Sequence, residues 1–181
     1  LATVLPAESV RANVQLSRVF GDHMVIQQQQ PIRLFGTADP GEQVTAEFSG
    51  KTATTTANDA GYFRLEPPAM QADGKSHTLK VSGKNTVILK DVLLGEVWIC
   101  SGQSNMEWRV KQSNNADEEI AAAKHPRIRH IKFPHRPADN PQSDIPRDGW
   151  KVCSPETVGD FTAVGYFYGR FLQKELDVPI G

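Results

Sequence analysis

Hydrophobic and polar residues alternate in short runs over the first half of the chain. From about residue 13 to residue 94, such runs recur at intervals of roughly ten residues, and Gly, Asn, Asp and Pro residues typical of tight turns separate them. This rhythm predicts an antiparallel β-sandwich or barrel. The expected strands are His23–Gln27, Ile32–Gly36, Val44–Phe48, Lys51–Ala57, Tyr62–Leu65, His77–Ser82 and Thr86–Leu89.

The pattern changes after Asp91. Val97–Cys100 is a short, continuous apolar run, which is typical of a parallel strand covered on both faces. Strands and helices then alternate, an order that predicts an α/β layer fold. The expected elements are a helix from Asn114 or Asn115 to about Lys124, a strand over Ile128–Phe133, a surface loop over Pro134–Asp148, an extended piece over Trp150–Cys153, a helix from Asp160 to about Leu176, and a further strand that begins at Asp177–Gly181.

The two patterns predict two domains. Residues 1–91 are expected to form a β-sandwich-like domain, and residues 92–181 the first part of an α/β domain that remains incomplete within this sequence.

The composition excludes some classes of partner. Of the 181 residues, 39% are hydrophobic, which is enough to bury a core. Twenty Lys and Arg residues stand against 21 Asp and Glu residues, so the net charge of -1 gives no basic field for nucleic acid. No apolar stretch approaches the length of about 18 residues that a membrane helix needs. The sequence therefore predicts neither nucleic acid nor a membrane as a partner.

The residues that commonly bind metals show no ligand pattern. Cys100 and Cys153 lack the spacing of zinc-binding pairs, and we expect both thiols to pack, half-buried, as small apolar groups. The five-residue spacing of His125, His130 and His135 fits neither a helix face nor alternate positions on a strand. We therefore expect no metal and no cofactor.

One serine stands where a nucleophile is often found. Gly102–Met106 follows directly after the apolar run, so Ser104 lies just beyond the carboxyl end of the expected strand, where open α/β sheets bind ligands. A serine nucleophile needs such an exposed hydroxyl near backbone N–H groups. A Ser-Asn pair near a helix start is also a common helix cap, and Met106 occupies the last glycine position of the Gly-x-Ser-x-Gly pattern. The residues alone leave both roles open.

The longer segment Leu94–Trp108, LGEVWICSGQSNMEW, resembles the signature of the sialate O-acetylesterase family, carbohydrate esterases of the SGNH-hydrolase type. Further similarity covers Val19–Gln27 with Pro31–Gly36, and Phe161–Arg170 through Val178–Gly181. The resemblance implies that a flavodoxin-like, three-layer α/β/α domain follows the β-sandwich. It also implies that Ser104 is the nucleophile and that the Ser104 backbone N–H is an oxyanion donor.

The same resemblance implies a serine carboxylic-ester hydrolase that removes acetyl groups from sialic acid or other acetylated sugars. An acetylxylan-type esterase and a non-catalytic carbohydrate-binding or interaction module are the alternatives. The family's catalytic Asp-x-x-His is not in this sequence, because no aspartate has a histidine three residues later. We therefore expect the remainder of the esterase domain, from the same gene or a second chain, as a partner. The expected location is secreted, periplasmic or lysosomal, although no segment fixes it.

Several nearby side chains are candidates for substrate binding. Glu107 and Trp108 can line a sugar pocket, since a carboxylate accepts hydroxyl hydrogen bonds and an aromatic face stacks on a pyranose. Trp108 can equally pack the joint between strand and helix. His130 and His135 are the histidines placed best to approach Ser104, although a surface or packing role is the default for all five histidines. The other candidates are Gln103 and Asn105 for substrate, and Arg127, Arg129, Lys132 and Arg136 for a sialate carboxylate or simply a solvated face.

Overall fold

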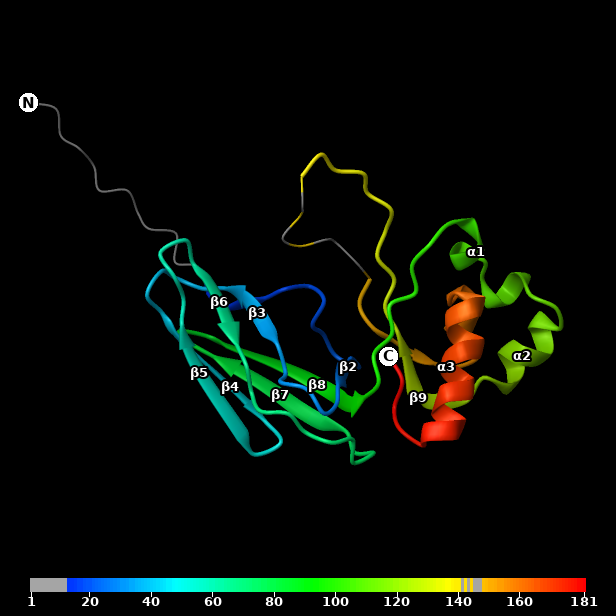
Figure 1. Ribbon diagram of the computed structural model, residues 1–181, viewed down its shortest axis with the longest axis horizontal. Helices are drawn as coiled ribbons and strands as arrows, with labels where there is room; N and C mark the ends of the chain where they lie inside the picture. Colours follow the sequence, from blue (N-terminus) through cyan, green and yellow to red (C-terminus); the bar gives the residue numbers. More distant parts are fainter. Residues whose placement is uncertain (1–12, 141, 143, 145–147) are drawn as a thin grey trace, which may run out of the picture.

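The computed structural model describes residues 13–140, 142, 144 and 148–181. The first half of the chain contains β-strands without a helix over its described residues (Figure 1). The strands are β1 (Gln15–Leu16), β2 (Val25–Gln27), β3 (Leu34–Thr37), β4 (Gln43–Phe48), β5 (Lys51–Thr56), β6 (Tyr62–Leu65), β7 (His77–Ser82) and β8 (Thr86–Gly95).

These strands form two sheets around one core. One sheet has the order β2-β8-β7-β4-β5 and the other the order β1-β3-β6. All pairs are antiparallel except the parallel pair of β2 and β8. Alternate residues point inward, so Val44 and Phe48 from the larger sheet meet Leu34 and Leu65 from the smaller one, each at most 1% exposed. The predicted β-rich first half is confirmed.

Two strand boundaries differ from the prediction because of left-handed backbone. The φ angle of His23 is +67°, and β2 therefore begins only at Val25. Asp91 has a φ angle of +54° and interrupts the alternation, yet β8 continues through the buried residues Val92–Leu94 to Gly95, six residues beyond the predicted end at Leu89. The predicted division between residues 91 and 92 thus falls within β8, and the division into domains stays a prediction.

The second half packs a helix against a short sheet. Its core contains Val110, Ile128, Val158, Phe161 and Tyr166, all at most 4% exposed. The elements are α1 (Ser104–Glu107), a 3-10 turn η1 (Val110–Gln112), α2 (Ala116–Ala122), β9 (His125–His130), β10 (Lys151–Cys153), a second 3-10 turn η2 (Val158–Asp160) and α3 (Ala163–Leu176).

The element types predicted here are found with shifted ends. Asn115 precedes α2 as expected, but its side chain makes no capping hydrogen bond. The strand predicted over Ile128–Phe133 is β9, which begins at His125 and pairs antiparallel with β10. The long helix α3 begins at Ala163, three residues later than predicted, because η2 precedes it. None of the helices in the described part of the chain combines the length and apolar character needed to cross a bilayer.

The expectation that Val97–Cys100 is covered on both faces is wrong. This segment is extended but exposed, with 91% of Ile99 and 47% of Trp98 accessible. An apolar run indicates that burial is favourable, but among the described residues no layer covers Ile99. The three-layer α/β/α arrangement of the second half stays a prediction.

The last residues of the chain form hydrogen bonds with two other segments in parallel orientation. On one side the Gly181 N–H donates to the Glu96 carbonyl over 2.8 Å, and the Trp98 N–H to the Gly181 carbonyl over 2.9 Å. On the other side the Ile180 N–H donates to Arg127 and its carbonyl accepts from Arg129, both at 2.9 Å. Ile180 therefore forms parallel bridges to both Glu96 and Ile128.

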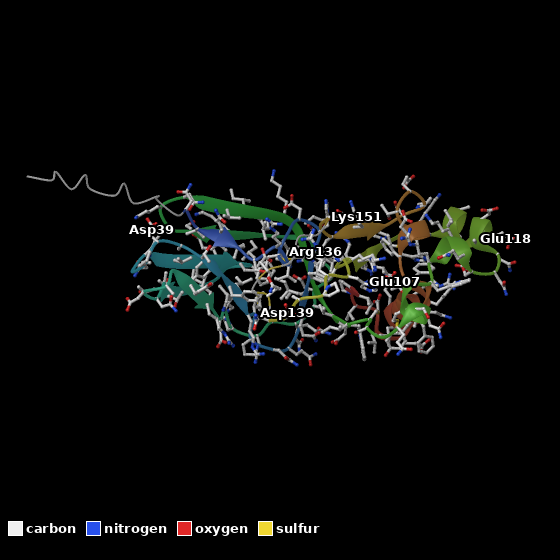
Figure 2. The ribbon with its side chains drawn as sticks, turned by 90° about the horizontal axis from the view of Figure 1, so that it is seen from above. Asp39, Glu107, Glu118, Arg136, Asp139 and Lys151 are labelled. Carbon is white, nitrogen blue, oxygen red and sulfur yellow. The ribbon has the colours of Figure 1, made fainter. Side chains whose placement is uncertain are left out.

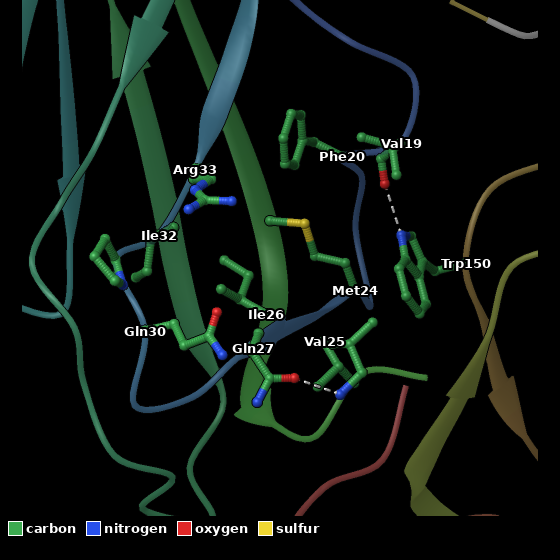
Figure 3. Close-up of a pocket in the computed structure, with 12 residues that line it drawn as sticks. Val19, Phe20, Met24, Val25, Ile26, Gln27, Gln30, Ile32, Arg33 and Trp150 are labelled. Carbon is green, nitrogen blue, oxygen red and sulfur yellow. Dashed lines mark hydrogen bonds between the residues drawn. The ribbon is translucent and has the colours of Figure 1, made fainter. Parts of the chain in front are cut away.

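The two halves meet along polar contacts at the junction. The guanidinium of Arg129, which is 6% exposed, donates to the Asp91 carboxylate over 2.7 Å and to the His23 carbonyl over 3.2 Å. A cavity of about 280 Å³ lies nearby, where the Trp150 indole N–H donates to the Val19 carbonyl over 2.8 Å (Figure 3). The molecule is elongated around this junction, with Asp39 and Glu118 near opposite ends (Figure 2).

The contact between Gly95 and the end of the chain predicts the effect of one substitution. A Cβ at Gly95 would overlap the backbone carbonyl of Pro179, which cannot retreat without losing its hydrogen bond from Glu96. Gly95→Ala should lower the free energy of unfolding by about 3 kcal/mol. Gly159→Ala is the control, because a Cβ there meets nothing nearer than 3.5 Å. Equal urea midpoints for the two variants would contradict this packing.

The ionisation of Asp91 should make the free energy of unfolding depend on pH. Burial alone would raise its pKa, but hydrogen bonds from Arg129, His23 and Ser76 outweigh burial and bring the pKa of Asp91 down to about 2. An unfolded aspartate titrates near pH 3.9, so the ionised side chain stabilises the fold above about pH 4, and this contribution is lost as the pH falls toward 2. Urea unfolding should show that wild type has a higher free energy of unfolding than Asp91→Asn at pH 5, and that this difference shrinks as the pH falls to 2.5. A difference that does not change with pH would contradict the role of Asp91.

Candidate functional site

Ser104 is the first residue of α1, directly after the extended segment that pairs with the end of the chain. The backbone of Gly102 has a φ angle of +155°, which L residues with a side chain rarely adopt, and the chain turns there toward the helix. Gln103 is the residue before the helix, and its carbonyl accepts from the Met106 N–H over 2.9 Å. Ser104 is exposed. Within the described residues, neither its hydroxyl nor its backbone N–H has a hydrogen-bond partner.

A cavity of about 590 Å³ lies beside α1. Its walls come from the segment before α1, from α1 itself, from β9 with the loop after it, and from α3. Gln103 and Met106, which are close to Ser104 in the sequence, are among the lining residues, together with His130, Phe161 and Tyr166, whereas Ser104 itself lies outside the lining. A pocket of this size, with apolar walls and a few polar groups, suits a small organic substrate.

The predicted substrate residues fall into two groups. Gln103 and Glu107 line the cavity, whereas Asn105 and Trp108 lie outside its lining. Trp108 is 53% exposed and its indole N–H donates to the Gln112 carbonyl over 3.0 Å. The packing alternative for Trp108 therefore has a definite hydrogen bond in its favour.

Glu107 is paired with Lys132 and His135. Its Oε1 lies 3.2 Å from Lys132 Nζ and 3.4 Å from His135 Nε2. The hydrogen bond from Lys132 is the main reason why the pKa of Glu107 lies below its usual value. Sequence reasoning missed this cluster, because Lys132 and His135 come from the segment after β9 and no local pattern connects them with α1.

None of the five histidines forms a hydrogen bond with Ser104 in the described structure. His130 is half-buried and stacks on Phe161, with ring centroids 4.4 Å apart. Burial lowers the pKa of His130 to about 4, so its imidazole is neutral at pH 7. His135 is 80% exposed beside Glu107, and His23 and His77 pair with aspartates in the first half.

The basic residues considered for a sialate carboxylate are mostly paired. Arg127 contacts Asp177, Arg129 contacts Asp91, and Lys132 contacts Glu107. Arg136 belongs to the loop that passes between the two halves (Figures 1 and 2). Arg129 is buried and ion-paired, so it belongs to the fold first, whereas Arg127, Lys132 and Arg136 stay candidates for a ligand.

The two thiols differ more than expected. Cys100 is exposed and Cys153 is buried, and neither forms a disulfide. The Cys100 Sγ leans against α3, where a Cβ at Gly165 would come within 2.9 Å of it, and this partial burial raises the pKa of Cys100. Burial raises the pKa of Cys153 to about 11. Among the described residues, no group of three or more His, Cys, Asp or Glu side chains is arranged to hold a metal ion.

Known proteins resemble this chain over most of its length. It is 30% identical to the rat sialate O-acetylesterase and 27% identical to the mouse one, each over 88% of the chain. The crystal structure of a carbohydrate acetylesterase from Xanthomonas citri superposes on 93% of the chain with a TM-score of 0.90 and 35% sequence identity. The chain belongs to the sialate O-acetylesterase family. No family model matches it.

The family relationship covers only part of each relative. The chain spans 33% of the length of the rat and mouse sialate O-acetylesterases and 39% of the Xanthomonas citri protein. The human sialate O-acetylesterase matches at 34% identity over 104 residues, which is 53% of this chain. Family membership agrees with the resemblance of Leu94–Trp108, the segment that contains Ser104.

Alkylation of the two cysteines can test how exposed each one is. At neutral pH, iodoacetamide should alkylate Cys100 in the folded 181-residue chain while Cys153 stays unmodified, because the Cys153 residue is only 1% exposed and its thiol is protonated. Peptide mass spectrometry before and after unfolding in urea reports both sites. Equal modification of the two thiols in the folded chain would contradict the placement of Cys153 in the second core.

Proposed function

We propose that this chain is part of a carbohydrate O-acetylesterase in which Ser104 is the nucleophile. The observation that carries the proposal is the exposed Ser104 at the start of α1, a helix whose residues Met106 and Glu107 line a cavity of about 590 Å³. The names of the relatives, sialate O-acetylesterase and carbohydrate acetylesterase, support an acetylated sugar as the substrate.

The reaction consists of two acyl transfers. In the first, the Ser104 Oγ attacks the acetyl carbonyl carbon, the bond from that carbon to the sugar oxygen breaks, and the serine proton ends on the released sugar hydroxyl. In the second, water attacks the acetyl carbon of the acetyl-serine, the bond from that carbon to Ser104 Oγ breaks, one water proton passes to Ser104 Oγ, and the other leaves with the product, acetic acid, which ionises to acetate in solution. Each step passes through a tetrahedral intermediate with a negatively charged oxygen.

The start of α1 offers a donor for that oxygen. The Ser104 backbone N–H has no partner among the described residues, and the first N–H groups of a helix have none within the helix. We assign this N–H to the oxyanion hole. Further donors, a general base and its orienting carboxylate must come from other residues, because no described histidine contacts Ser104.

We propose that the base and its orienter come from the portion of the esterase that this chain does not span. An apolar surface is available for such a portion. Trp98 and Tyr168 pack edge-to-face with ring centroids 5.1 Å apart, and Ile99, Val164 and Phe171 are exposed beside them. Patches of this kind on a protein surface commonly mark sites that another segment or protein covers.

The nature of the sugar is the finer part of the proposal. We favour acetylated sialic acid or a related acetylated sugar because of the two mammalian relatives, and an acetylxylan-type ester is the alternative. A non-catalytic carbohydrate-binding module is the rival, and it is favoured by the lack of a histidine contact to Ser104 among the described residues.

Substitution of Ser104 tests the proposal. In the full-length protein, Ser104→Ala should lower kcat/KM for an aryl acetate by about 10⁴-fold or more, because the nucleophile is lost. A fluorophosphonate probe should label Ser104 in wild type and nothing at this position in the variant. Ser82→Ala, on β7 in the first half and outside the lining of this cavity, is the control and should retain activity.

Two outcomes would count against an esterase. Equal hydrolysis by wild type and Ser104→Ala would remove Ser104 from the mechanism. Binding of acetylated glycans without any labelling of Ser104 would favour the carbohydrate-binding module.

A further inference from the structure

Helix α1 holds Ser104 with few contacts of its own. It is four residues long, none of its residues is buried, and no side chain caps its start. So short a helix is not stable in water by itself, since isolated helices need about 12 residues or more to form. The position of Ser104 must therefore depend on contacts that other elements make with α1.

The chain after α1 is fixed to the second core. The Ala163 N–H, at the start of α3, donates to the Trp108 carbonyl over 2.7 Å, and the Val110 N–H donates to Phe161 over 3.1 Å. These bonds locate the residues that follow the helix. No side chain of α1 is buried, so contacts between its exposed side chains and other elements also bear on how the helix is held.

Glu107 makes the strongest such side-chain contact. Its Oε1 is 3.2 Å from Lys132 Nζ and 3.4 Å from His135 Nε2. Ser104 and Glu107 are three residues apart on the helix and therefore lie on the same face, one turn from each other. A contact that holds the Glu107 carboxylate therefore also restrains the helical turn that carries Ser104.

Lys132 is attached to a rigid part of the molecule. It follows β9 by two residues, and the last residue of β9, His130, is half-buried and stacked on Phe161. The Lys132 and Glu107 side chains are each 44% exposed, so both can meet without a large desolvation cost. The pair therefore connects the short helix α1 with the segment that leaves β9.

We infer that Lys132 and His135 position Ser104 by holding Glu107, so that Glu107 and Lys132 are positioning residues and not contacts of the sugar. This inference rests on the proposed function, because it assigns a task in acyl transfer at Ser104. It also replaces the earlier expectation that the Glu107 carboxylate binds sugar hydroxyls.

The test uses substrates that lack a sugar. In the full-length protein, Glu107→Gln and Lys132→Met should each lower kcat for an aryl acetate, and the rate of fluorophosphonate labelling at Ser104, by about tenfold with little change in KM. The double variant should be no slower than either single variant, because both remove the same contact. High salt should slow the wild type toward the variants and leave the variants unchanged.

Lys80→Met is the matched control. It removes an exposed pair of the same kind, since Lys80 Nζ lies 3.1 Å from Glu47 Oε1 and both side chains are about half exposed. This pair lies in the β-sheet of the first half, so the control should keep the wild-type labelling rate. Thermal unfolding of every variant checks that the fold is intact, and surface pairs of this type should cost at most about 1 kcal/mol.

The possible results separate the inference from the proposed function. If Glu107→Gln raises only the KM for an acetylated sugar and leaves aryl acetate turnover and labelling at the wild-type level, Glu107 contacts substrate and the inference is wrong. If Ser104→Ala removes activity while both Glu107→Gln and Lys132→Met match wild type, the proposed function is supported. The inference that Glu107 and Lys132 position Ser104 is then wrong. Full activity of Ser104→Ala would overturn both.

Discussion

The parallel pairing of Pro179–Gly181 between two segments organises the second half of the molecule. Backbone hydrogen bonds join this segment to Glu96–Trp98 on one side and to β9 on the other. The segment that leads to Ser104 therefore has its direction set by residues some 80 positions later in the sequence. Backbone groups must be paired when buried, so this arrangement fixes where the chain emerges at Gly102. Without this pairing, the segment before Ser104 would have no defined position relative to α3.

The same edge links the esterase-like half to the β-rich half. The side chains of Gln27 and Gln28 donate to the Glu96 carboxylate at 3.0 and 2.9 Å, and Gln27 also accepts from the Val97 N–H. The buried side chain of Arg129 adds an ion pair to the half-buried Asp91, which links β9 to β8 across the junction. We interpret these contacts as the ones that hold the segment leading to Ser104 in a fixed orientation relative to the β-sheets.

Much of the fold was predictable from local patterns, and the errors have physical causes. Strands β6 and β7 have the predicted bounds, because alternation and flanking turn residues define them locally. The end of β8 was missed, since a left-handed Asp91 interrupts the pattern without ending the strand. The burial of Val97–Cys100 was mispredicted, because an apolar run does not tell which partner covers it. Ser104 itself needed the family resemblance, since its local sequence also fits an ordinary helix cap.

The contacts near Ser104 could not be predicted from any local sequence pattern. Lys132 and His135 meet Glu107 only because β9 and α1 border the same cavity. An attacking oxygen must be placed within a few tenths of an ångström to react efficiently, and a four-residue helix cannot supply that precision alone. The helix therefore depends on contacts from other elements. The exposed Trp98, Ile99 and Tyr168 line the same cavity as α1, so a segment that covers them would also lie close to the helix that carries Ser104.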